Sequence, residues 1–153
     1  MSAMRRLKPD RDDRHDIVQF AADFSVEITP RLAEKVEDFR LVLRPGTLVY
    51  ITFLQGSDVG DTIKLAERLR NEGFTPVPHF AARSIPNSVF LAGMLTRLKE
   101  RADLDQVLLI GGAPNPPVGE FSDTMQLLET GLFDQFGVKR IGVAGHPEGS
   151  PDI

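Results

Sequence analysis

The residues of this chain best suited to chemistry lie at or near the ends of short apolar runs that have strand character. They supply a carboxyl, a hydroxyl, two imidazoles and the backbone of small or apolar residues: Glu27, Thr52, His79, Ile110, Gly111, Gly112, Ala144 and His146. A carboxyl can move a proton, an imidazole can hydrogen-bond a cofactor, and a glycine lets the backbone approach a ring closely. In parallel β/α proteins the carboxyl ends of strands are the usual place for a ligand site.

Five apolar segments that could position these groups alternate with helical patterns. The predicted strands are 24–29, 48–53, 76–80, 107–110 and 140–144, and the predicted helices are 17–23, 31–39, 62–71, 87–102 and 122–133. The runs VLLI and IGVA are apolar throughout, as in strands that are buried on both faces. The alternation therefore predicts an α/β protein with a parallel sheet.

Two architectures fit this pattern. The first is a TIM-barrel-like (β/α) fold with about five parallel strands present, which is a partial barrel, since a complete one has eight strands. The second is an open five-stranded doubly wound sheet, which suits a chain of 153 residues. A dinucleotide-binding sheet of the second kind carries GxGxxG between its first strand and helix, but that junction here reads VEITPRLAEK and has no glycine.

The charge pattern divides the chain into an arm and one domain. Residues 1–16, MSAMRRLKPDRDDRHD, are rich in both charge signs and poor in apolar groups, which predicts a flexible N-terminal arm. Residues 17–153 are predicted to form a single β/α domain. Within them no repeat or linker marks a second domain.

Composition excludes several classes of function. The formal net charge is -4, which gives no support for binding to nucleic acid or to anionic membranes. The chain has no cysteine, and its three histidines are dispersed, so no metal site is predicted. No apolar run is long enough to span a bilayer and no signal peptide is recognised, so we expect a cytoplasmic protein.

Five stretches together resemble one protein family. VEITP, VYITF, GDTIKLAERLRNEGFTPVPHF, LLIGGAPNPP and IGVAGHPEG look like segments of the flavin-dependent methylenetetrahydrofolate reductases, in matching order. The resemblance covers roughly residues 25–153. It implies the first five strands of a TIM barrel, with FAD across their carboxyl ends, NAD(P)H as reductant and a folate as substrate. The implied reaction converts 5,10-methylenetetrahydrofolate to 5-methyltetrahydrofolate in one-carbon metabolism and methionine biosynthesis.

That reaction needs a hydride donor and an acid that opens the five-membered ring of the folate. Strand alternation places Glu27 on the face opposite Val26 and Ile28, which in a barrel is the interior. A low dielectric there would favour the protonated carboxyl. By resemblance Glu27 is the family's acid; the competing interpretation is a glutamate on a solvent-exposed strand face.

The resemblance also implies the flavin contacts. Thr52 and His79, at the carboxyl ends of the second and third strands, match positions that contact the flavin. The segment from Ile110 to Gly112 matches a flavin-contacting loop, and Ala144 and His146 belong to the terminal motif. Without the family, each has an ordinary interpretation: a packed strand threonine, a surface histidine or turn glycines.

Two residues depart from the family pattern. Ala113 stands where relatives commonly carry an aspartate, and Ser150 stands where they carry a histidine. A non-catalytic subunit or binding protein that keeps the scaffold is therefore a second hypothesis. Five strands of an eight-stranded barrel would also leave two edges to be covered by a second copy in a homo-oligomer, by a completing subunit or by more of a longer chain. Alternatively, the chain would fold as an open sheet of five strands.

Overall fold

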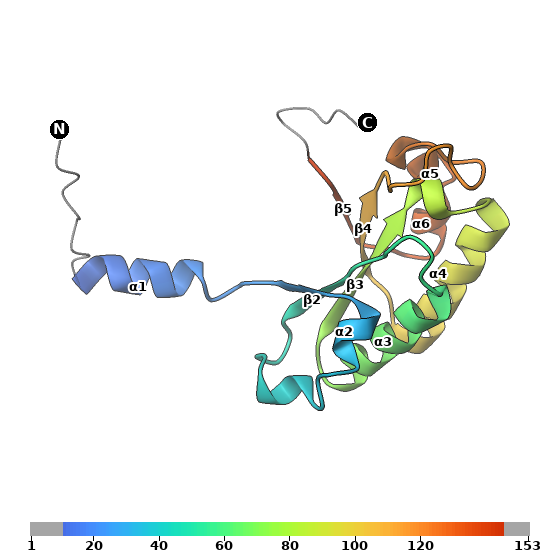
Figure 1. The fold of residues 1–153 in the computed structure, drawn as a ribbon. Helices are drawn as coiled ribbons and strands as arrows, with labels where there is room; N and C mark the ends of the chain where they lie inside the picture. Colours follow the sequence, from blue (N-terminus) through green and yellow to red (C-terminus); the bar gives the residue numbers. More distant parts are fainter. Residues whose placement is uncertain (1–10, 146–153) are drawn as a thin grey trace, which may run out of the picture.

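The computed structural model describes residues 11–145, which form an α/β fold around one open sheet (Figure 1). The sheet has five parallel strands that lie side by side in chain order: β1 (Val26–Ile28), β2 (Leu48–Ile51), β3 (Thr75–Ala81), β4 (Gln106–Ile110) and β5 (Arg140–Val143). The sheet is not closed, so β1 and β5 are its edges. The prediction of a parallel α/β fold is confirmed.

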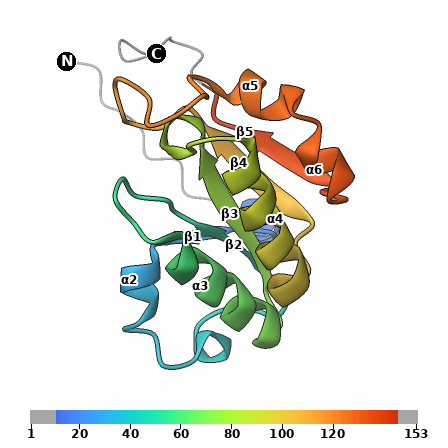
Figure 2. The ribbon, with the colours of Figure 1, turned by 90° about the vertical axis from the view of Figure 1, so that its right-hand side faces the viewer.

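The helices of the domain cover one face of this sheet. They are α2 (Pro30–Ala33), α3 (Val59–Asn71), α4 (Ser88–Ala102), α5 (Thr124–Glu129) and α6 (Leu132–Gln135), with two short 3₁₀ helices, η1 (Phe39–Leu41) and η2 (Ala82–Ser84). Figure 2 shows α3 and α4 side by side in front of the strands. Sequential strand order with helices on one side is the arrangement found in segments of (β/α) barrels, whereas doubly wound sheets reverse their strand order.

Alternation along the strands separates a core face from an open one. On the helix side, Val49, Ile51, Phe80, Val107 and Leu109 are completely or almost completely buried. We call the other side the open face, since among residues 11–145 no helix packs against it. The register of the strands places these residues on it: Glu27, Tyr50, Val77, His79, Leu108 and Ile110.

The predicted helix over 31–39 is wrong in length, because α2 ends at Ala33. The guanidinium of Arg68, from α3, explains this early end. It donates hydrogen bonds to the carbonyl of Ala33 at 3.0 Å and to those of Val36 and Glu37 at 2.7 and 2.9 Å. These bonds satisfy the backbone carbonyls at and just beyond the end of α2. The chain can therefore leave the helical conformation there without unpaired carbonyls.

Other predicted boundaries also move. The single helix over 122–133 is two helices, because Gly131 adopts a left-handed φ of 67° between α5 and α6. Strand β3 begins at Thr75 and ends at Ala81, one residue beyond the prediction at each end, since both residues pair with neighbouring strands.

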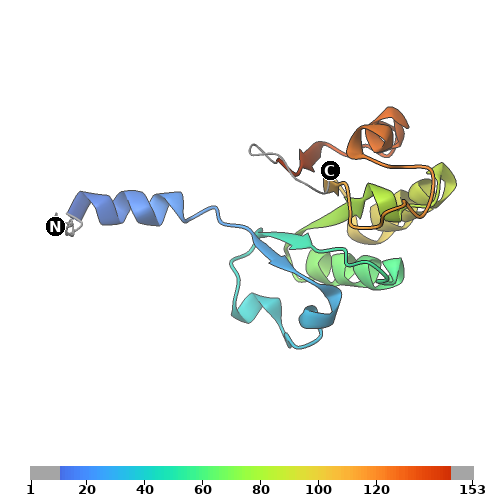
Figure 3. The same cartoon turned by 45° about the horizontal axis from the view of Figure 1, so that its top comes forward.

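The first helix differs most from its prediction. Helix α1 runs over Arg11–Phe20 instead of 17–23, so residues 11–16 of the predicted arm are helical. Apolar periodicity marks the face of a helix that packs, and residues 13–20 are all exposed. Figure 3 shows α1 standing clear of the sheet and of the other helices.

No helix in the described part of the chain is both long enough and apolar enough to cross a membrane.

Candidate functional site

A hydrogen-bonded carboxylate and hydroxyl lie on the open face at the sheet's β1 edge. Glu27 is the middle residue of β1, and Thr52 directly follows β2. The Thr52 backbone N–H donates to the Ile28 carbonyl at 3.0 Å, which continues the pairing of the two strands beyond β2. This holds the Thr52 hydroxyl against Glu27, and its Oγ1 donates to Oε1 of the carboxylate at 2.7 Å.

The structure confirms the face predicted for Glu27 but not its surroundings. Val26 and Ile28 are half-buried against the core, so Glu27 lies on the opposite side. Its side chain is nevertheless exposed, whereas the sequence predicted a low-dielectric interior. The reason is that β1 is an edge strand and, within residues 11–145, nothing covers the open face above it.

His79 lies on β3, two strands from Glu27 on the same face, and is deeply buried. Only 5% of the residue is exposed, and its Nε2 has no hydrogen-bond partner among the described residues. The Tyr50 ring packs edge-on against the imidazole, with centroids 6.1 Å apart. Burial lowers the pKa of His79 below its ordinary value of 6.5, and the Glu27 carboxylate partly opposes this by raising it.

The lowered pKa predicts a stability that decreases in mild acid. Below pH 6.5 the unfolded chain binds a proton at His79 that the folded chain resists, so the free energy of unfolding falls as the pH falls. We expect His79→Gln to flatten this dependence, measured by urea unfolding between about pH 7.5 and about pH 5.5. His15→Gln, at an exposed histidine of α1, should keep the wild-type slope. If the free energy of unfolding depends on pH equally in the wild type and in His79→Gln, His79 is not the group responsible.

A second group of predicted residues meets at the carboxyl ends of β4 and β5. Ile110, Gly111 and Ala144 line one cavity of about 130 Å³ together with Arg83, Leu109, Ser122, Asp123 and Thr124. The Ala144 N–H donates to the Leu109 carbonyl at 3.3 Å, which places the end of β5 against β4. Three of the predicted cofactor contacts are therefore brought together.

Gly112 is held close to β3. Its φ is +87°, and a Cβ at this position would lie 3.1 Å from the Cβ of Ala81. A glycine is favoured here on both grounds, because other residues rarely adopt this φ and a Cβ would make an unusually tight contact with Ala81. The neighbouring Ala113 is exposed and offers neither charge nor hydrogen bond.

Arg83 was not among the predicted site residues, but its hydrogen bonds link the loops at this end of the sheet. Its N–H donates to the Gly111 carbonyl at 2.9 Å, and its Nε donates to the Ser122 carbonyl at 2.9 Å. Its own carbonyl accepts from the Val118 N–H at 2.8 Å. No local pattern marks such a residue, because its partners come from distant loops.

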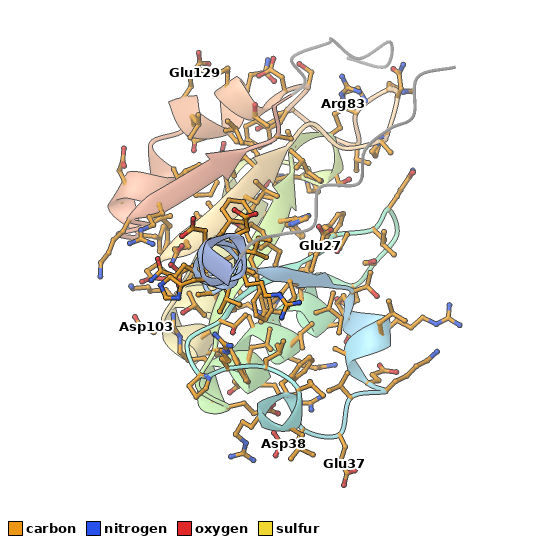
Figure 4. All side chains as sticks on the ribbon, turned by 90° about the vertical axis from the view of Figure 1, so that its left-hand side faces the viewer. Glu27, Glu37, Asp38, Arg83, Asp103 and Glu129 are labelled. Atoms are coloured by element: carbon orange, nitrogen blue, oxygen red, sulfur yellow. The ribbon has the colours of Figure 1, made fainter. Side chains whose placement is uncertain are left out.

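Tyr50 was not predicted as a site residue either. Strand alternation from Tyr50 to Thr52 could have placed both side chains on one face of the sheet. Figure 4 looks onto the open face, with Glu27 on β1 and Arg83 among the loops at the far end. The structure thus brings Glu27, Thr52, Tyr50 and His79 into one group. His146 lies outside the described residues, as does Ser150.

Among residues 11–145 no group of three or more acidic or histidine side chains could hold a metal ion. No known protein-family model matches this chain.

Proposed function

We propose that this chain is a flavoprotein of the methylenetetrahydrofolate reductase type. It would act in the cytoplasm and reduce 5,10-methylenetetrahydrofolate to 5-methyltetrahydrofolate with NAD(P)H through FAD. The observation that carries the proposal is the hydrogen bond from Thr52 to Glu27, beside a buried His79 whose Nε2 has no partner in the described structure. These are the three residues to which the family resemblance assigns the acid and two flavin contacts.

The residues present fit a flavin on the open face. An unsatisfied buried nitrogen is costly. Because Nε2 of His79 is out of contact with solvent, a polar ligand atom that removed this cost would have to open its surroundings. The cavity at Ile110, Gly111 and Ala144 has room for roughly four water molecules, so it can take only part of a flavin. The ring would lie across the open face, where FAD supplies hydride transfer between the nicotinamide and the folate.

Glu27 supplies the proton in this proposal. Its Oε1 accepts the Thr52 hydroxyl, which leaves Oε2 to carry the proton toward the substrate. The exposed carboxyl exchanges protons readily with water while the face is open. A ligand that covers the carboxyl would exclude water from the proton transfer.

The test of cofactor binding is an absorption spectrum. We expect the purified protein to retain FAD or to take it up, with oxidised flavin bands between about 350 and 500 nm. His79→Ala should weaken flavin retention, while His15→Ala, at the exposed histidine of α1, should leave it unchanged. A colourless protein that fails to take up added FAD would overturn the proposal.

Thr52 is a positioning residue for Glu27, and this can be tested separately. Thr52→Val keeps the shape but removes the donor to Oε1, so we expect folate reduction to fall about tenfold to a hundredfold. Thr52→Ser should restore most of the rate because it restores the hydroxyl. Thr96→Val deletes a hydroxyl that bonds only within α4 and should have no effect. An unchanged rate in Thr52→Val would show that the bond does not orient the acid.

A second candidate is a non-catalytic binding protein or subunit that keeps the scaffold. The exposure of Glu27 and the apolar side chain of Ala113 favour it, since neither supplies the environment expected of an active enzyme. Flavin binding without folate turnover would identify this case. Under either candidate, a homo-oligomer or a completing partner subunit would cover the sheet's two edges.

A further inference from the structure

Helix α1 presents large apolar side chains to solvent. Ile17 is 59% exposed and Phe20 is 92% exposed, and every residue from 13 to 25 is exposed. Figures 1 and 4 show α1 projecting from the side of the open face, away from the strands. A helix of ten residues is marginal in water by itself, since isolated helices below about 12–15 residues rarely persist. We therefore expect α1 to pack against something.

A groove that could receive such a helix lies at the amino ends of β2 to β5. Its volume is about 590 Å³, and its walls combine apolar, polar and charged residues: Ala22, Asp23, Phe24, Arg44, Pro45, Gly46, Thr47, Leu48, Thr75, Gln106 and Arg140. Neither Arg44 nor Arg140 takes part in an ion pair within the described residues. The groove thus offers a partly apolar wall and two positive charges that have no ion-pair partner among the described residues.

Helix α1 carries the complementary groups. Asp16 precedes Phe20 by four residues, so the carboxylate and the ring lie on the same side of the helix. Asp16 has no ion-pair partner in the part of the chain that the structure describes. The ring matches the apolar part of the groove at Phe24, Pro45 and Leu48. The carboxylate matches its two guanidinium groups, which outnumber its one acidic residue, Asp23.

We propose that α1 docks in this groove on a second copy of the chain, and that two copies exchange their α1 helices. The segment Ala22 to Phe24 forms one wall of the chain's own groove, and α1 continues from it away from the sheet. The helix therefore points out of its own groove, which leaves that groove open to the α1 helix of a second copy. Such an exchange is two-fold symmetric, so both grooves are filled by the same contact.

The apolar residues of this contact supply part of the area that a dimer needs. A buried phenylalanine removes roughly 150–250 Å² from solvent, and the exchange buries Phe20 and Ile17 twice together with both groove walls. A specific interface needs about 1,000 Å² in total. The groove lies at the amino ends of the strands, so the inference does not depend on the function proposed for the carboxyl ends.

The first test is the mass of the full chain in solution, measured by sedimentation equilibrium over a range of concentrations. We expect a dimer whose dissociation constant rises at least about tenfold in Phe20→Ser. Because Phe20 is almost fully exposed, this change should leave the far-ultraviolet circular dichroism of the domain intact. Leu41→Ser, at another exposed apolar residue, should remain dimeric.

Charge reversal tests the pairing of Asp16. Asp16→Lys and Arg44→Glu should each weaken the dimer, as should Arg140→Glu. Combining Asp16→Lys with both arginine reversals should recover part of the lost affinity, because the charges are again opposite. Additive losses in the combined variant would overturn the pairing.

Cysteine cross-linking distinguishes exchange from folding back, because the chain has no cysteine of its own. Ile17→Cys, on the docking side of α1, and Thr75→Cys on another chain should form a mixed disulfide when the two are combined under oxidising conditions. A monomer at every concentration or a dimer that survives Phe20→Ser would overturn the proposal. So would a third result, from a variant that carries both cysteines in one chain: a disulfide that forms only within single chains. The last would show α1 in its own groove.

Discussion

Replacing Glu27 with Gln is expected to lower the rate of folate reduction about 10²- to 10⁴-fold, the usual contribution of a positioned general acid. The amide is nearly the same shape as the carboxyl, and its oxygen can still accept the Thr52 hydroxyl, which donates at 2.7 Å in the wild type. The fold and flavin binding should therefore persist. What is lost is the ability to deliver a proton to the folate ring.

The measurement separates the two halves of the reaction. Stopped-flow absorbance of the flavin should show reduction by NAD(P)H at the wild-type rate in Glu27→Gln, followed by slow reoxidation with the folate. Glu129→Gln is the matched control, because Glu129 lies on α5, away from Glu27 (Figure 4). Wild-type folate turnover in Glu27→Gln would show that another group supplies the proton.

Leu109→Ala is expected to destabilise the protein by about 2–5 kcal/mol, the range for a buried Leu→Ala change. Leu109 is 0% exposed in the central part of β4, where it packs against the helices behind the sheet. Its neighbours Leu108 and Ile110 face the other way, toward the proposed flavin. The expected loss in the free energy of unfolding therefore has two parts: the transfer free energy of the deleted leucine methyl groups, and the cost of a cavity that the rigid sheet cannot fill.

Urea unfolding followed by circular dichroism measures this loss, with Leu41→Ala as the control. The same chemical change at Leu41, which is 77% exposed, should cost no more than about 0.5 kcal/mol. A small effect at Leu109 would mean that the core relaxes around the deletion. A change in the urea slope would instead indicate that the unfolded state or the cooperativity has changed.

The parallel fold was predictable because each strand carries its own signal. Runs such as VLLI are apolar at every position, and the amphipathic patterns of α3 and α4 mark the faces that pack on the sheet. The helix after β1 was not predictable in length, because Arg68 satisfies its last carbonyls from a distant part of the chain. The limits of α1 were missed for a different reason, since its residues 13–20 are all exposed and no packed face there shapes the sequence.

By itself, the sequence determined the parallel strands and the face on which Glu27 lies, because alternation along a strand is a local property. Only the tertiary structure decided that Thr52 bonds Glu27 and that Tyr50 packs against His79, since strand register sets which side chains meet. It also decided that Glu27 is exposed while His79 is buried. Glu27 lies on an edge strand and His79 on a central one, so neighbouring strands shield only the imidazole.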